Sequence, residues 1–170
     1  CAALTLQACH EDDGGSDIAA APKQLLQINS TVYNGLRANP DINALFVGAG
    51  ATNIGDEPCD VRVHRMSFDT IGGAGESATS SGVFMLPQGD APECNSSLPV
   101  LLYAHGTSDQ KTYDLSRLDL LISDPTNPNP ATNEAMILLA NYASQGYAVI
   151  APNYAGYSDS SLDYHPYINR

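Results

Sequence analysis

Two apolar tracts of strand length, separated by a helix-like segment, constrain the fold of this chain more than any other feature. The first is Pro99–Thr107, which reads Pro-Val-Leu-Leu-Tyr-Ala-His-Gly-Thr, and the second is Gly146–Tyr157, which begins Gly-Tyr-Ala-Val-Ile-Ala-Pro. Short apolar runs bounded by Gly and Pro are typical of buried strands. Between them, Ala135–Ser144 is apolar most of the way round, with Thr132 or Asn133 as the expected helix cap. The pattern predicts a strand–helix–strand unit with parallel strands.

The segment upstream of these strands predicts an antiparallel hairpin. Asp60–Phe68 alternates apolar and polar residues, with one slip at His64-Arg65 that is compatible with a bulge. Gly72–Gly75 interrupts the pattern, and Ser81–Pro87 is a second strand that its proline is expected to end. Further upstream, Lys23–Leu36 is interpreted as a short helix or an extended arm. The sequence therefore predicts an α/β fold in which a hairpin leads into parallel strands.

The composition is that of a globular protein with a packed core. Of its 170 residues, 43% are hydrophobic and 15% are charged, and the formal net charge is −12. This excess of acidic residues argues against nucleic acid and against an anionic membrane surface as partners. It favours a neutral or cationic small molecule over a phosphate compound as the ligand.

The first residues have the pattern of an exported protein. Residues 1–8 are apolar, whereas residues 9–22 are acidic, rich in Gly and Ala, and expected to form a flexible tether. Leu6-Gln7-Ala8-Cys9 is similar to the lipobox of bacterial lipoproteins, in which a signal peptide is removed before a lipid-bearing cysteine. Residues 1–8 are thus interpreted as a signal-peptide remnant and Cys9 as the lipidation site. The alternative is a disordered end with an incidental cysteine. The expected location is the periplasm, the outer membrane through the anchor at Cys9, or the exterior of the cell.

Two further cysteines predict a disulfide bond. Cys59 and Cys94 flank the predicted hairpin, and in an exported protein such a pair favours a disulfide over free thiols. In the chain-entropy model, closing this loop contributes about 3–4 kcal/mol to the free energy of unfolding. No C-x-x-C motif occurs, and the His and Cys residues lack the spacing of a zinc site. The sequence therefore predicts neither a metal ion nor another cofactor.

The turn after the first predicted strand carries the strongest candidate for chemistry. His105-Gly106-Thr107-Ser108 begins where the strand ends, and a glycine at that place lets the backbone turn sharply. The backbone N–H groups of Thr107 and Ser108 could then donate hydrogen bonds to the oxyanion of an acyl-transfer reaction. His105 is expected to support the loop rather than to act as a base. The alternative is an ordinary turn, because His-Gly often occurs by chance.

Two other polar clusters have weaker support. Gly156-Tyr-Ser158-Asp-Ser160 departs from the G-x-S-x-G nucleophile motif at its last glycine, and three residues separate it from its strand. Ser158 is therefore interpreted as part of a loop at the rim of a pocket. Asp163 and His165 stand two residues apart, but no nucleophile precedes them as hydrolase order would require. We interpret this second cluster as a polar aromatic loop.

Together these segments resemble the N-terminal part of bacterial exported α/β-hydrolases of the secretory lipase and esterase type. The matching segments are Pro22–Leu26, Ser80–Pro87, Pro99–Thr107 and Gly146–Tyr157. The resemblance covers roughly residues 22–170. It implies that three segments are the second, third and fourth strands of the family's sheet, namely Ser81–Leu86, Val100–Ala104 and Ala148–Ala151.

The resemblance also implies a function. The whole protein would be a serine hydrolase that cleaves carboxylic esters, including lipids, through an acyl-enzyme. Its catalytic serine, acid and histidine would lie beyond Arg170, so that residues 23–170 would form an incomplete hydrolase domain that is inactive alone. The oxyanion donors at Thr107 and Ser108, supported by His105 and Gly106, would be the contribution of this chain.

Two alternatives remain open at this point. A serine peptidase of the prolyl-oligopeptidase type shares the fold, but such enzymes usually carry a large N-terminal domain, whereas the lead-in here is a short hairpin. A non-catalytic lipoprotein that uses the fold as a binding module belongs to a different class.

Overall fold

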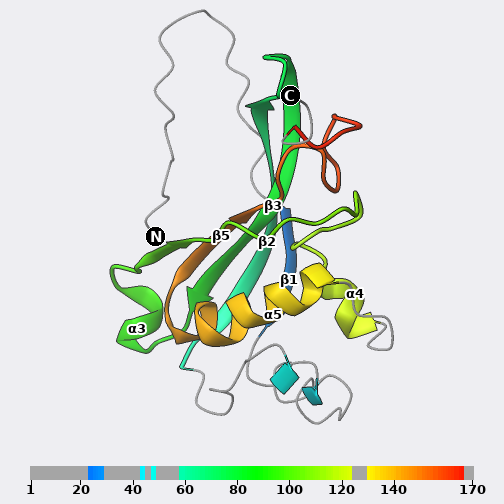
Figure 1. The fold of residues 1–170 in the computed structure, drawn as a ribbon. Coiled ribbons are helices and arrows are strands. Elements are labelled where there is room, and N and C mark those ends of the chain that lie inside the picture. The colour runs from blue at the N-terminus through cyan, green and yellow to red at the C-terminus, as the bar shows by residue number, and fades with distance from the viewer. Residues whose placement is uncertain (1–22, 29–42, 45–46, 49–57, 124–129, 167–170) are drawn as a thin grey trace, which may run out of the picture.

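The computed structural model describes residues 23–28, 43–44, 47–48, 58–123 and 130–166. Its described strands form one mixed sheet in the order β1-β2-β3-β5-β4 (Figure 1). They are β1 Lys23–Ile28, β2 Asp60–Ile71, β3 Ser77–Gln88, β4 Val100–Leu102 and β5 Ala148–Pro152. The helices after β3 are α3 Pro92–Asn95, α4 Leu118–Ser123 and α5 Pro130–Asn141, and the 3-10 turn η1 Ala143–Gln145 follows α5. The predicted signal-peptide remnant, the tether and Cys9 lie outside the described residues.

The predicted antiparallel hairpin is confirmed and is longer than expected. β2 and β3 pair over their whole length, from Asp60 opposite Gln88 to Ile71 opposite Ser77, without a register shift. The slip at His64-Arg65 therefore makes no bulge against β3. A register shift occurs instead where β1 pairs with β2, between Gln24 and Leu26 of β1. Residues 23–28 are thus an edge strand among the described strands, in agreement with the extended arm, and the rest of Lys23–Leu36 lies outside the described residues.

The expectation that Pro87 ends the second strand of the hairpin is wrong, because β3 continues to Gln88. β3 pairs with β5 only over Gly82–Met85. Pro87 lies beyond that stretch, where β3 has no strand neighbour on the β5 side among the described residues. A residue without an N–H group is tolerated at such a place in a sheet.

The predicted strand–helix–strand unit is also confirmed. β4 and β5 are parallel, and α4 and α5 lie between them in the chain. The helix α5 begins at Pro130, before the expected cap, because proline at the first helical position needs no hydrogen-bond acceptor for its nitrogen. The strand β4 ends at Leu102 rather than at Ala104, although the Tyr103 N–H still donates to the Ile150 carbonyl at 2.8 Å.

The core lies between α5 and one face of the sheet, with α4 at the end of α5 (Figure 1). Alternate residues of β2, β3 and β5 face the helix, so the same strands present their other side chains to the opposite face. The buried core positions are Val61, Val63, Val83, Met85, Val149 and Ala151 from the sheet, and Ala131, Ala135, Met136, Leu138, Leu139 and Ala140 from α5. The described helices are all too short or too polar to span a bilayer.

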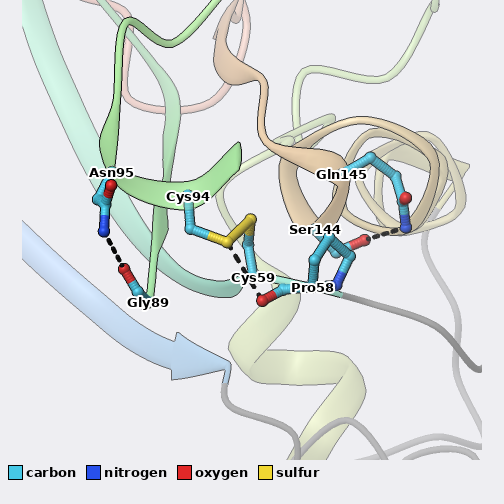
Figure 2. The surroundings of a disulfide bond; sticks show 7 residues. All are labelled: Pro58, Cys59, Gly89, Cys94, Asn95, Ser144 and Gln145. Atoms are coloured by element: carbon cyan, nitrogen blue, oxygen red, sulfur yellow. Dashed lines mark hydrogen bonds between the residues drawn. A yellow bond between two sulfur atoms is a disulfide. The ribbon is translucent and has the colours of Figure 1, made fainter. Parts of the chain in front are cut away.

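The predicted disulfide between Cys59 and Cys94 is present, with Cα atoms 5.3 Å apart (Figure 2). It joins the residue before β2 to the short helix α3 that follows β3. The Cys59 N–H donates to the Ser144 carbonyl of η1 at 3.2 Å. A Cβ atom at Gly146, which has a φ of +95°, would stand 2.5 Å from the Glu93 carbonyl oxygen of α3. The turn η1, the start of β2 and the helix α3 therefore meet at one corner.

Candidate functional site

The candidate site lies at the carboxyl ends of β4 and β5, where the loops after the two strands meet. The β4 loop carries His105, Gly106, Thr107 and Ser108. His105 is buried at 4% exposure, whereas Gly106 and Thr107 are exposed. The β5 loop supplies Tyr154 and Tyr157, and the tyrosine at position 157 is fully buried. In open α/β sheets, ligands bind at the carboxyl ends of the strands.

The His105 ring is neutral and packs among three tyrosine rings. Its ring stacks on Tyr113 and Tyr154 at centroid distances of 4.5 and 4.0 Å, and Tyr157 contacts it edge-on at 5.2 Å. His105 Nδ1 lies 2.7 Å from the Gly106 carbonyl oxygen, which can only accept, so Nδ1 carries the proton. Nε2 is buried without a hydrogen-bond partner among the described residues. Burial lowers the pKa of His105, and the Gly106 carbonyl and Glu134 only partly oppose this effect.

Tyrosine hydroxyls anchor the β4 loop at both ends. The Tyr154 hydroxyl donates to the His105 carbonyl at 3.0 Å. The Tyr157 hydroxyl donates to the Ser108 carbonyl and accepts from the Ser108 N–H at 3.2 Å. Between these anchors, the exposed Thr107 N–H has no hydrogen-bond partner in the described part of the chain. Of the two predicted oxyanion donors, Thr107 is therefore available and Ser108 is engaged by Tyr157.

Gly106 is not needed for the conformation of this turn. Its φ lies outside the left-handed region, and a Cβ atom there would have no heavy atom within 4 Å. The reason expected from the sequence, a sharp turn that only glycine allows, does not apply in this structure. What the missing side chain provides is open space beside the Thr107 peptide.

A buried carboxylate holds the two loops together behind the site. Asp114, at 5% exposure, accepts from the Ser158 hydroxyl at 2.6 Å and from the Ser116 hydroxyl at 2.7 Å. The Arg65 guanidinium of β2 lies 3.3 Å from the same carboxylate. Burial alone would raise the pKa of Asp114, but the hydrogen bonds from Ser158, Ser116 and Asn153 outweigh it and hold the pKa below its usual value.

Asn153, directly after β5, is the fully buried centre of this network. Its side-chain amide donates to Asp114 at 2.8 Å and to the Ser81 hydroxyl of β3 at 3.1 Å. Its side-chain oxygen accepts from the Leu115 N–H at 3.0 Å. Because every polar group of this side chain has a partner, the network fixes where the β5 loop leaves the sheet.

The weaker candidates are engaged in other contacts. Ser158 has a φ of +48°, and its hydroxyl donates to Asp114 rather than to a histidine. Asp163 is exposed and pairs with Lys111 at 3.1 Å. The His165 ring stacks on Tyr157 at a centroid distance of 3.9 Å. Neither Ser158 nor the pair Asp163 and His165 therefore forms a nucleophile–base arrangement among the described residues.

Several residues of this region were not predicted to belong to the site, although the sequence contains patterns that indicate them. Asp114-Leu-Ser116 has an aspartate two residues before a serine, which is the pattern of a turn in which the carboxylate accepts from the backbone. Asn153 stands directly after an apolar strand, where a polar residue can join two loops. Tyr154 and Tyr157 are aromatic residues with a polar end, and such residues find a hydrogen-bond partner when buried.

The described residues contain no group of three or more His, Cys, Asp or Glu side chains that could hold a metal ion.

We compared the chain with protein families, curated proteins and solved structures. No protein-family model and no curated protein matches the chain. Solved structures do match, among them the rice cell wall degrading esterase LipA from Xanthomonas oryzae, at 26% identity and a TM-score of 0.60 over 89% of this chain. A ligand-bound form of LipA matches at 25% identity with a TM-score of 0.62 over 88% of this chain. The fold is hydrolase-like.

A candidate hydrolase from Legionella pneumophila has the same fold, with 21% identity and a TM-score of 0.54 over 85% of this chain. In each of these comparisons the chain covers 32% of the solved structure. The chain therefore spans about a third of the length of the proteins that it resembles.

Proposed function

We propose that this chain is the N-terminal part of a serine hydrolase that cleaves carboxylic esters through an acyl-enzyme. The observation that carries the proposal is the N–H of the exposed residue Thr107, which lies in the loop after the carboxyl end of a parallel strand in a hydrolase-like fold. A fixed N–H donor stabilises the negative charge that develops on the carbonyl oxygen when a nucleophile attacks an ester. The nucleophile, its histidine and the acid belong to residues after Arg170.

The substrate is a small-molecule ester or a lipid ester. Similarity to an esterase supports ester cleavage over peptide cleavage. The serine peptidase remains an outcome of the test, because full-length protein that hydrolyses a peptide substrate but no ester would favour it. Full-length protein that hydrolyses neither substrate would favour the binding module.

The test of the proposal compares ester hydrolysis by the 170-residue chain, by the full-length protein, and by its Gly106→Val variant. We expect turnover of a p-nitrophenyl ester by the full-length protein and none by the 170-residue chain. A valine side chain has room at position 106, so the loop should keep its fold, but it would shield the neighbouring Thr107 N–H. Losing one oxyanion donor reduces kcat by roughly 100- to 1000-fold.

The full-length variant Ser158→Ala is the control for this experiment, because the Ser158 hydroxyl is bound to Asp114 and has no histidine beside it among the described residues. It should retain turnover per folded molecule. Turnover by the 170-residue chain that this substitution abolishes would make Ser158 the nucleophile. If the Gly106→Val protein is as active as the parent, His105-Gly106-Thr107 is an ordinary turn without a role in catalysis.

We further propose that the protein is exported and that Cys9 is its lipidated N-terminus. The Cys59–Cys94 disulfide and the similarity to LipA support export. Cys9 itself rests on the sequence pattern. A Cys9→Ala variant should move from the membrane fraction to the soluble fraction, with export checked by the presence of the disulfide. A variant that still sediments with membranes would contradict the anchor.

A further inference from the structure

The loop that carries the Thr107 N–H is suspended between two tyrosine hydroxyls of the β5 loop. One hydroxyl, from Tyr154, holds the His105 carbonyl, and the other, from Tyr157, holds both the N–H and the carbonyl of Ser108. Gly106 and Thr107, the two exposed residues of the loop, lie between these fixed points. The direction of the Thr107 N–H is therefore determined by groups that come from a different strand.

The two tyrosines are themselves held rigidly. Tyr157 is fully buried, and its ring contacts His105, Tyr113 and His165 at centroid distances of 5.2, 5.9 and 3.9 Å. Tyr154 stacks on His105, and burial raises the pKa of its hydroxyl, so this group remains protonated and able to donate. Both residues belong to the loop that begins at Asn153, which the Asp114 network fixes against β3.

Ser108 was predicted to be an oxyanion donor, but in the structure it anchors the loop instead. Its N–H donates to the Tyr157 hydroxyl oxygen, so an oxyanion would have to displace that hydroxyl to receive the same hydrogen bond. The Tyr157 hydroxyl donates in turn to the Ser108 carbonyl, which closes a two-point clamp on one residue. A clamp of this kind serves to hold the loop, not to bind substrate.

We propose that Tyr154 and Tyr157 are positioning residues of the oxyanion loop, and that Thr107 rather than Ser108 supplies its oxyanion donor. The inference rests on the proposed esterase function and adds to it the residues that set the donor's direction. Neither tyrosine touches the substrate. Each acts through the loop peptide that its hydroxyl holds.

The test uses the full-length protein with Tyr157→Phe and Tyr154→Phe, which remove only the hydroxyl groups and leave the rings in place. Tyr147→Phe is the matched control, because Tyr147 is 39% exposed and packs on Tyr142, away from the loop. The kcat for p-nitrophenyl ester hydrolysis is measured per active site, counted by stoichiometric acylation. Affinity is measured for a boronic acid that forms a tetrahedral adduct with the nucleophile.

We expect Tyr157→Phe to lower kcat on the order of 10- to 100-fold, because a misdirected donor is lost mainly in the transition state. KM should change little, and the boronic acid should bind more weakly by a similar factor. Tyr154→Phe should show the same pattern to a smaller extent, since it holds one group of the loop instead of two. Tyr147→Phe should match the parent.

The outcomes separate this inference from the proposed function. Full-length protein without ester hydrolysis would refute the function itself. An active parent whose two Phe variants keep its kcat per active site and its boronic acid affinity would overturn only the inference, even if their melting temperatures fall. If Tyr157→Phe yields no folded protein, the kcat and boronic acid affinity of Tyr154→Phe decide the question.

Discussion

At the scale of single residues, the stability of the candidate site depends on a carboxylate that is buried and still ionised. Removing a carboxylate from water is costly unless its oxygens are hydrogen-bonded. Asp114 meets that condition through Ser116, Asn153, Ser158 and Arg65, which come from β2 and from the loops after β4 and β5. One side chain therefore links three segments that are distant in sequence.

We predict that Asp114→Asn lowers the free energy of unfolding by about 2–4 kcal/mol at neutral pH, because it leaves buried donors without an acceptor. The folded protein holds the pKa of Asp114 below its usual value. The stabilisation is therefore complete above about pH 5 and is lost as the pH falls through the unfolded value toward the folded one. Urea unfolding of parent and variant across this range should show their difference shrinking toward acid pH.

Asp119→Asn is the matched control for that measurement, because the Asp119 side chain is 44% exposed and pairs with Arg117. It should change the unfolding free energy by less than about 1 kcal/mol. A difference between the parent and Asp114→Asn that stays constant from neutral to acid pH would contradict an ionised Asp114.

At the scale of elements, β4 forms one of the two outer edges of the described sheet. Among the described strands it is an outer edge, and its side chains at Val100 and Leu102 are 59% and 69% exposed. Leu102 lies opposite Ile150, which lies opposite Phe84, so an apolar row crosses the sheet on the face away from α5. Apolar edge strands pair readily with other chains.

We predict that the 170-residue chain self-associates and that Leu102→Lys reduces the association, because a charge on an edge strand opposes pairing. Light scattering after size-exclusion chromatography, over a range of protein concentrations, measures the effect. Ile71→Lys is the control, since Ile71 is 72% exposed but lies at the far end of the hairpin. If the 170-residue chain stays monomeric at every protein concentration tested, the β4 edge does not mediate self-association.

At the scale of the whole molecule, the fold was predictable and the site was predictable only in part. The hairpin and the parallel pair follow from apolar periodicity, which is local in sequence and forced by burial. The bond from Asn153 to Asp114 joins residues 39 positions apart, so no local pattern contains it. The role of Gly106 was also beyond reach, because the space around a missing Cβ depends on residues that only the folded chain brings near.

The disulfide described above has a consequence for the order of events during folding. Cys59 and Cys94 enclose the β2–β3 hairpin, whose two strands pair directly with each other over their whole length. The crosslink can therefore close once residue 94 has entered an oxidising compartment, before α5 and β5 arrive. The hairpin then becomes a covalently fixed template, and β5 needs only to add to an edge that is already in register.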